Sequence, residues 1–279
     1  MNSASVGPRV AIFDSGVGGL SILAHAQQLL PHCRFDYISD NGGFPYGDKP
    51  DEVVIERTCQ VLARYFARAP YPADIVVIAC NTASTLALPA LRAIYSLPVI
   101  GVVPAIKPAA SASANGYFGL LATPATIRRA YTRQLIDDFA NHCHVVCVGS
   151  SALVAMAEAQ LRGEPVDTAQ LAHELLPFTV ESASNPYPQR LDCLVLACTH
   201  FPLLQQPIQA LLGPQVRLLD SGEAIARRIA FWQDNGVTAG TPAVQVDSPA
   251  TAWFSAPSGN PESLRPALAR FALNNVDYL

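Results

Sequence analysis

Short apolar runs alternate with longer amphipathic segments along the chain. The runs have the length of buried strands, and the segments between them carry apolar residues at helical spacing. The expected strands are 9–14, 34–40, 74–80, 98–103, 117–123, 144–149, 192–198 and 216–222, with more strand material in 243–259. The expected helices are 20–30, 51–68, 84–95, 124–140, several across 151–182, 203–212, 223–236 and 262–273. This alternation predicts an α/β fold with parallel sheets.

One strand pattern is written twice. "DIVVIACNT" at 74–82 and "DCLVLACTH" at 192–200 each run from Asp through apolar residues to Ala-Cys and then turn polar. The regular alternation loosens near 104 and restarts near 117. We therefore expect two similar parallel-sheet α/β domains related by pseudo-symmetry, with the active site in the cleft between them. The predicted first domain is discontinuous, 9–103 plus 217–279, and the second is 104–216.

Composition narrows the class of protein. Half of the 279 residues are apolar, 14% are charged and the net charge is −4, which gives no support to nucleic-acid binding. No apolar run approaches the roughly 20 residues of a membrane span, and the opening "MNSASVGPR" does not read as a signal peptide. Seven cysteines, an odd number scattered through strand-like segments, indicate free thiols in a reducing cytoplasm.

Two of these cysteines stand where ligands bind. Cys80 and Cys198 each end a strand and precede an expected helix, and ligands of parallel sheets lie beyond the carboxyl ends of the strands. Free N–H groups at a helix start lower the pKa of a thiol. The neighbouring polar residues are Asn81, Thr82, Thr199 and His200, and the first strand similarly ends in Asp14 and Ser15 before a glycine-rich turn. A buried cysteine is more often a small apolar residue, but the repeated context favours function for this pair.

Two such thiols suit the inversion of a stereocentre. Racemisation by proton transfer needs a base on one face of a carbon and an acid on the other, and cysteine can serve as either. Pyridoxal phosphate would require a Schiff-base lysine, and the only lysines, Lys49 and Lys107, are each followed by proline. The alternation in 142–144 places neighbouring side chains on opposite faces of a strand, so no metal site is expected there. The residues therefore favour deprotonation without a cofactor.

Seven segments, in order along almost the whole chain, resemble the glutamate racemase family, which supplies D-glutamate for bacterial peptidoglycan. They are "FDSGVGGLS" (13–21), "DNGGFPYGDK" (40–49), "ACNTAS" (79–84), "GVVPAIKPA" (101–109), "LLATPATI" (120–127), "LACTHFPLL" (196–204) and "LLDSGEAIA" (218–226). The resemblance implies a cofactor-independent enzyme in which Cys80 and Cys198 are the paired acid and base. It also implies that Asp14 acts near Cys80 and the substrate ammonium, and that His200 assists Cys198. The substrate-binding residues that it implies are Asp14, Ser15, Tyr46, Gly47, Asn81, Thr82, Thr123, Thr199 and His200.

One position departs from the family pattern. Where many relatives carry a glutamate, this chain has Ala155, and Glu158 follows three residues later. The sequence therefore assigns no assisting carboxylate to the Cys198 side. Three alternatives stay open: an aspartate racemase, a hydantoin racemase, or an amino-acid-binding protein without turnover. A homodimer is compatible with the sequence but is not indicated by it.

Overall fold

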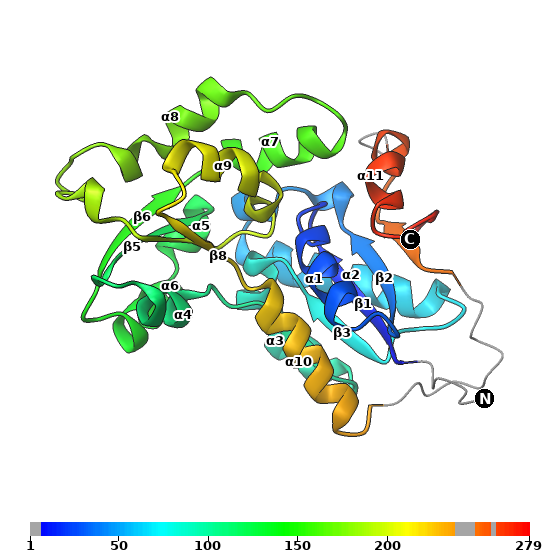
Figure 1. The fold of residues 1–279 in the computed structure, drawn as a ribbon. Helices are drawn as coiled ribbons and strands as arrows, with labels where there is room; N and C mark the ends of the chain where they lie inside the picture. The colour runs from blue at the N-terminus through cyan, green and yellow to red at the C-terminus, as the bar shows by residue number, and fades with distance from the viewer. Residues whose placement is uncertain (1–6, 238–248, 258–260) are drawn as a thin grey trace, which may run out of the picture. The chain divides into compact units, whose positions relative to one another are not determined.

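The computed structural model describes residues 7–237, 249–257 and 261–279 (Figure 1). The chain forms two compact units, Met1–Val102 with Gly222–Leu279, and Val103–Ser221. We call them unit 1 and unit 2. Each contains one parallel sheet with helices on both sides, which confirms the predicted fold class. The second crossing between the units follows residue 221, five residues later than the expected 216, because the strand Arg217–Leu219 hydrogen-bonds within the sheet of unit 2.

Sheet A belongs to unit 1 and has the strand order β10-β9-β2-β1-β3-β4. Its strands are β1 (Arg9–Asp14), β2 (Arg34–Ser39), β3 (Ile75–Ile78), β4 (Val99–Gly101), β9 (Thr251–Phe254) and β10 (Asn275–Tyr278). All of the pairings are parallel. The central strands β1 and β3 are buried along their whole length, as their unbroken apolar runs require when helices cover both faces of a sheet.

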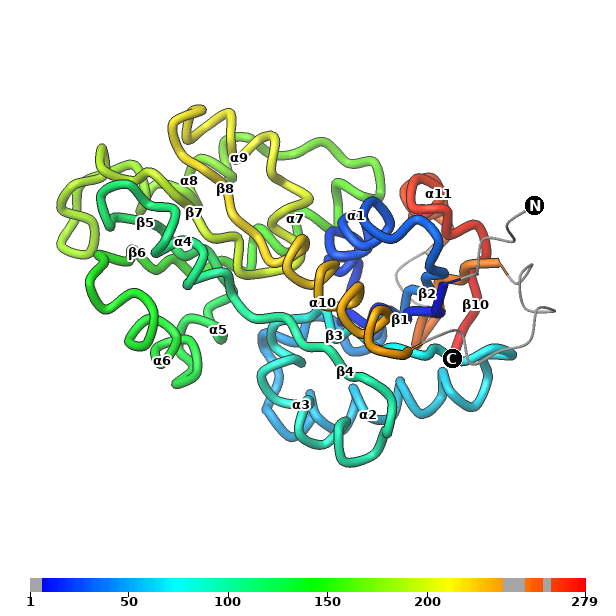
Figure 2. Tube along the Cα trace, turned by 60° about the horizontal axis from the view of Figure 1, so that its bottom comes forward, coloured from blue at the N-terminus to red at the C-terminus, as the bar shows by residue number. Residues whose placement is uncertain are grey.

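Helices cover both faces of sheet A, with α2 and α3 together on one side and α1 and α10 on the other (Figure 2). Their bounds are α1 (Leu20–Leu29), α2 (Asp51–Arg68), α3 (Asn81–Ile94) and α10 (Gly222–Asp234). The core beneath α2 and α3 includes Phe13, Val61, Tyr65 and Leu91. The last helical segments of the unit are a 3₁₀ turn at Pro261–Leu264 and α11 (Arg265–Ala269).

Sheet B belongs to unit 2 and has the strand order β6-β5-β7-β8. Its strands are β5 (Tyr117–Ala122), β6 (His144–Gly149), β7 (Cys193–Leu196) and β8 (Arg217–Leu219), all paired in parallel. The helices α4, α5 and α6 lie on one side, and α7, α8 and α9 lie on the other (Figure 2). Their bounds are α4 (Ile106–Ala112), α5 (Pro124–Arg128), α6 (Ala130–Phe139), α7 (Ala152–Leu161), α8 (Thr168–Thr179) and α9 (Gln205–Leu212).

The two sheets repeat one strand order. The sequence β2-β1-β3-β4 in sheet A corresponds to β6-β5-β7-β8 in sheet B, and β9 and β10 extend only sheet A. Cys80 follows β3 and Cys198 follows β7, so the two cysteines occupy the same position in the two sheets. The doubled Ala-Cys pattern therefore reflects a doubled topology.

Several predicted elements differ in detail. The expected helix 124–140 is two helices, because Arg129 adopts an extended conformation (φ −68°, ψ 139°). The helix expected from 84 begins at Asn81, and part of the expected strand region 243–259 lies outside the described residues. The strand β10 was not predicted. In the described part of the chain, no helix combines the length and the apolar character that crossing a membrane demands.

Candidate functional site

Cys80 lies between a buried strand and a long helix. It is the N-cap residue of α3, its own conformation is extended, and it is 7% exposed. The hydroxyl of Ser84 donates to the Ile78 carbonyl (2.6 Å) and accepts from the Val102 N–H (2.9 Å), which ties the turn to β3 and to the end of β4. The thiol therefore sits on a fixed strand–helix turn beside the free N–H groups of a 14-residue helix.

The end of β1 brings a hydroxyl to this thiol. Asp14 is fully buried and accepts from the Gly16 N–H (2.8 Å), and the Ser15 hydroxyl lies 3.7 Å from the Cys80 sulfur. A Cβ atom at Gly19 would come within 2.9 Å of the Asp14 Cβ, so this close approach of the turn requires glycine. The structure thus brings together Ser15 and Cys80, which lie 65 positions apart in the sequence.

The first residues of α3 complete this cluster. Asn81 and Thr82 are both buried, and Asn81 Oδ1 has no hydrogen-bond partner among the described residues. A buried acceptor without a partner is costly unless a ligand or water satisfies it. We call Asp14, Ser15, Cys80, Asn81 and Thr82 the Cys80 half-site.

The hydroxyl of Tyr46 forms a hydrogen bond with another side chain of the protein. The hydroxyl donates to Asp40 Oδ2 (2.6 Å), and Arg57 holds both oxygens of the same carboxylate (2.7 Å each). Burial and the neighbouring Asp40 raise the pKa of Tyr46 far above its ordinary value. Tyr46 therefore fixes the loop that carries the partly buried Gly47. Sequence reasoning missed the roles of Asp40 and Arg57.

Cys198 follows β7 and is also 7% exposed. Buried Thr199 and His200 come next, and the 3₁₀ turn η4 (Phe201–Leu204) leads into α9. The Cys198 sulfur lies 3.8 Å from His200 Nδ1. The prediction of an immediate helix start is therefore met at Cys80, whereas Cys198 precedes a 3₁₀ turn and has an imidazole beside it.

A carboxylate supports this imidazole. Glu158 Oε1 lies 3.0 Å from His200 Nε2, and Glu158 is buried in α7. The signal in the sequence was a single charged residue in the otherwise uncharged helix segment "ALVAMAEAQL". Ala155 therefore does not leave the Cys198 side without a carboxylate, because Glu158, three positions along the same helix, supplies it. We call Glu158, Cys198, Thr199 and His200 the Cys198 half-site.

His200 is electrostatically unusual. Its burial lowers the pKa of the imidazole, but hydrogen bonds to Cys198 and Glu158 and the negative charges of these groups outweigh that effect. The resulting pKa lies well above 6.5. The folded protein therefore favours the protonated form of this imidazole.

Thr123 has a structural role at the end of β5. Its hydroxyl accepts from the Thr126 N–H (3.3 Å) and lies 2.9 Å from the Thr126 hydroxyl, so it caps α5. The contact of Thr123 with substrate stays a prediction.

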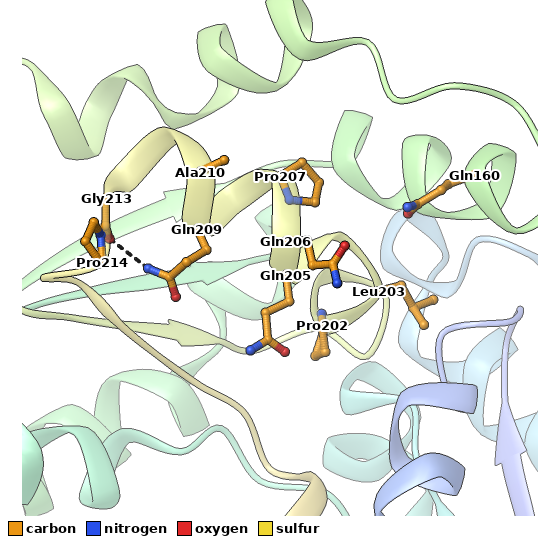
Figure 3. A pocket seen from close by; sticks show the side chains of 10 residues that line it. All are labelled: Gln160, Pro202, Leu203, Gln205, Gln206, Pro207, Gln209, Ala210, Gly213 and Pro214. Atoms are coloured by element: carbon orange, nitrogen blue, oxygen red, sulfur yellow. Dashed lines mark hydrogen bonds between the residues drawn. The ribbon is translucent and has the colours of Figure 1, made fainter.

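A separate groove opens on unit 2. It has a volume of about 680 Å³, and its lining includes Gln160, Gln206 and Gln209 but neither Cys198 nor His200 (Figure 3). The Gln209 amide donates to the carbonyls of Gly213 and Val216, so that side chain stabilises the end of α9. Among the described residues, no group of three or more His, Cys, Asp or Glu side chains is arranged to hold a metal ion.

Comparison with known proteins identifies the family. The family model described as Asp/Glu/Hydantoin racemase matches residues 20–229. The glutamate racemase of Klebsiella pneumoniae is 46% identical over 272 residues, which cover 98% of this chain and 92% of that relative. This chain belongs to the Asp/Glu/hydantoin racemase family. The resemblance inferred from the motifs is confirmed.

Solved structures of family members agree with this assignment. The glutamate racemase of Escherichia coli, in complex with L-glutamate and the activator UDP-MurNAc-Ala, is 42% identical with a TM-score of 0.90, covering 98% of both chains. A glutamate racemase isoform from Bacillus anthracis is 28% identical with a TM-score of 0.78, covering 100% of this chain and 98% of that one.

Proposed function

We propose that this chain is a glutamate racemase that interconverts L- and D-glutamate without a cofactor, with Cys80 and Cys198 as its two acid–base groups. The observation that carries the proposal is the equivalence of the two thiols. Each follows the corresponding strand of a repeated strand order, each is 7% exposed, and each lies within 4 Å of a polar side-chain atom. The likeness to glutamate racemases over nearly the whole chain supports glutamate as the substrate.

The proposed reaction is a balanced proton transfer at Cα. One cysteine, as a thiolate, removes the Cα proton, and the electron pair of the C–H bond moves toward the α-carboxylate. The other cysteine, as a thiol, donates its proton to the opposite face of the same carbon. The thiol and the thiolate have then exchanged, so the net reaction needs no oxidant or reductant.

The half-sites offer groups that suit an amino acid. The buried Asn81 Oδ1 and the Asp14 carboxylate are acceptors that suit the substrate ammonium. The free N–H groups at the start of α3 suit a carboxylate whose negative charge grows during deprotonation. Tyr46 and Thr123 stay proposed substrate contacts, because a hydroxyl oxygen that bonds to a protein group can still accept a further hydrogen bond.

We further propose a use for the D-glutamate that the enzyme forms and a location for the enzyme in the cell. D-Glutamate formed in this way would supply peptidoglycan synthesis, in the cytoplasm. The seven cysteines are all free, and two reactive thiols require a reducing compartment.

The decisive experiment is isotope exchange in deuterium oxide. The wild-type protein, with no added cofactor, is expected to place deuterium at Cα of both L- and D-glutamate and to interconvert them, as measured by proton NMR and chiral chromatography. A folded protein with intact thiols that exchanges neither enantiomer would overturn the proposal.

The same assay separates the alternatives. Faster turnover of aspartate or of a hydantoin than of glutamate would assign a different member of the family. Glutamate binding that persists in Cys80→Ser and Cys198→Ser, together with an inactive wild type, would indicate a binding protein.

A further inference from the structure

Arg162 caps the end of α7 and holds Glu158 at two points. Its Nη1 donates to the Glu158 carbonyl (2.9 Å), and its Nη2 lies 3.0 Å from Glu158 Oε2. The Arg162 side chain is 27% exposed, while Glu158 is buried. One side chain thus binds both the backbone and the carboxylate of the same residue.

The two oxygens of Glu158 have different partners. Oε2 pairs with Arg162, and Oε1 lies 3.0 Å from His200 Nε2, whose ring reaches the Cys198 sulfur through Nδ1 at 3.8 Å. A continuous line of contacts therefore runs from Arg162 at the partly exposed end of a helix to a buried thiol.

We propose that Arg162 is a positioning residue of the Cys198 half-site, which fixes Glu158 against His200 and draws part of its negative charge away from the imidazole. The inference rests on the proposed function, because it assigns a role in the same reaction. A carboxylate held at its backbone and at one oxygen has few rotamers left, so its other oxygen stays directed at His200. The guanidinium offsets part of the carboxylate charge. This limits how strongly Glu158 stabilises the protonated imidazole of His200, so that the imidazole can still release a proton.

The other ionisable groups near this line are few. The turn η4 that follows His200 packs against α7 and α9. Glu158 is the only titratable residue in α7, and η4 and α9 contain none. In the next helix, α8, His173 is exposed and Glu174 is partly buried. Cys198, Glu158 and Arg162 are therefore the groups expected to control the charge of His200.

The test measures the titration of the His200 imidazole by NMR, with the signal assigned through its loss in His200→Gln. Arg162→Gln is expected to raise the pKa of His200 by about 0.5, since the guanidinium no longer offsets part of the Glu158 charge that faces the imidazole. It should also lower kcat about threefold to tenfold while KM stays within about twofold, because the loss concerns proton transfer rather than substrate binding. Arg162→Lys keeps the positive charge and should return the pKa of His200 to its wild-type value. A lysine cannot contact both the Glu158 carbonyl and Oε2 as the two guanidinium nitrogens do, so it should restore kcat only in part.

The chain offers a matched control. Arg227 and Glu223 also form an i,i+4 ion pair, but both side chains are 69% exposed. Arg227→Gln is expected to change neither the imidazole titration nor kcat. In a Glu158→Gln background, Arg162→Gln should have no further effect on either quantity, because its influence passes through Glu158.

The alternative is that Arg162 only caps α7. Lower thermal stability in Arg162→Gln, with an unchanged imidazole titration and unchanged kcat, would overturn the inference. If Arg162→Gln fails to fold, the intermediate kcat of Arg162→Lys serves as the test, and wild-type kcat in that variant would equally contradict the inference. Failure of the wild type to racemise would overturn the proposed function itself, which is a different result from an active wild type whose His200 titration does not respond to Arg162.

Discussion

Cys80 and Cys198 occupy the same place in two sheets of the same strand order, yet different groups lie beside their sulfur atoms. A hydroxyl, that of Ser15, lies 3.7 Å from Cys80, and an imidazole, that of His200, lies 3.8 Å from Cys198. The Cys80 side adds the N-terminus of a 14-residue helix, and the Cys198 side adds the buried carboxylate of Glu158. One topology therefore places two different sets of polar groups beside its two cysteines.

This difference has a consequence for pH. A serine hydroxyl and a helix terminus do not titrate in the physiological range, whereas an imidazole is a titratable group. We therefore expect the Cys198 half-site to carry most of the pH dependence of the reaction.

Removal of either thiol should have the largest effect. Cys80→Ala and Cys198→Ala are each expected to lower racemisation in both directions by about 1,000-fold, within the range that a general acid or base contributes. Each variant should keep Cα exchange, if any, with only one enantiomer of glutamate, and the two variants should keep it with opposite enantiomers. Exchange with the same enantiomer in both variants would contradict the assignment of one cysteine to each face.

Loss of Arg57 should mainly reduce stability. Asp40 is fully buried, and its carboxylate is held by Arg57 and by Tyr46. Arg57→Met leaves this charge without its cation, and we expect a loss of about 3 kcal/mol in the free energy of unfolding. Urea denaturation measures this loss, with the exposed Arg227→Met as control. A loss no larger than that of the control would show that the pair does not hold the Tyr46 loop.

Glu158→Gln tests whether the pH dependence arises at the Cys198 half-site. The expected fall in kcat/KM is about tenfold, since a hydrogen bond to a charged group contributes roughly 1.5–3 kcal/mol. The pKa of His200 is raised by folding, so its protonation stabilises the protein fully below a pH of about 6.5. This stabilisation is lost as the pH rises through the pKa of the folded state.

The variant should lower that pKa, because Glu158 raises it. The difference in unfolding free energy between wild type and Glu158→Gln is therefore expected to be largest at low pH and to shrink as the pH rises. Urea titrations over a range of pH measure this difference. A difference that grows with pH would show that the imidazole is not the cation held by Glu158.

Much of this architecture could be predicted from the sequence, because it depends on local patterns. The runs at 10–13 and 75–80 are apolar throughout, and runs of this length are typical of strands that helices cover on both faces. The two cysteines could be predicted as site residues because the same Ala-Cys pattern ends two strands. The break at Arg129 was missed, because residues 124–140 have helical periodicity on both sides of it.

The supporting side chains could not be predicted, because they reach the site from distant parts of the chain. Glu158 lies 42 positions from His200, and Arg57 lies 17 positions from Asp40. Their contacts depend on how helices pack on the sheets, which a single sequence does not specify. The Asp40–Tyr46 bond is local, but a tyrosine beside glycine and proline gives no sign of where its hydroxyl points.

Ser15→Ala should have the smallest effect and tests the Cys80 side. Removing one hydroxyl from a thiol contact of 3.7 Å is expected to lower kcat/KM about threefold, within the range of roughly 0.5–1.5 kcal/mol for one hydrogen bond. Because the serine does not titrate, the pH profile of the variant should keep the shape of the wild-type profile. Steady-state kinetics in both directions over a range of pH measure both quantities, with the exposed Ser111→Ala in unit 2 as control. A changed pH profile in Ser15→Ala, with none in Ser111→Ala, would mean that the Cys80 half-site also titrates, and the contrast between the two thiols would then lie in their partners rather than in their response to pH.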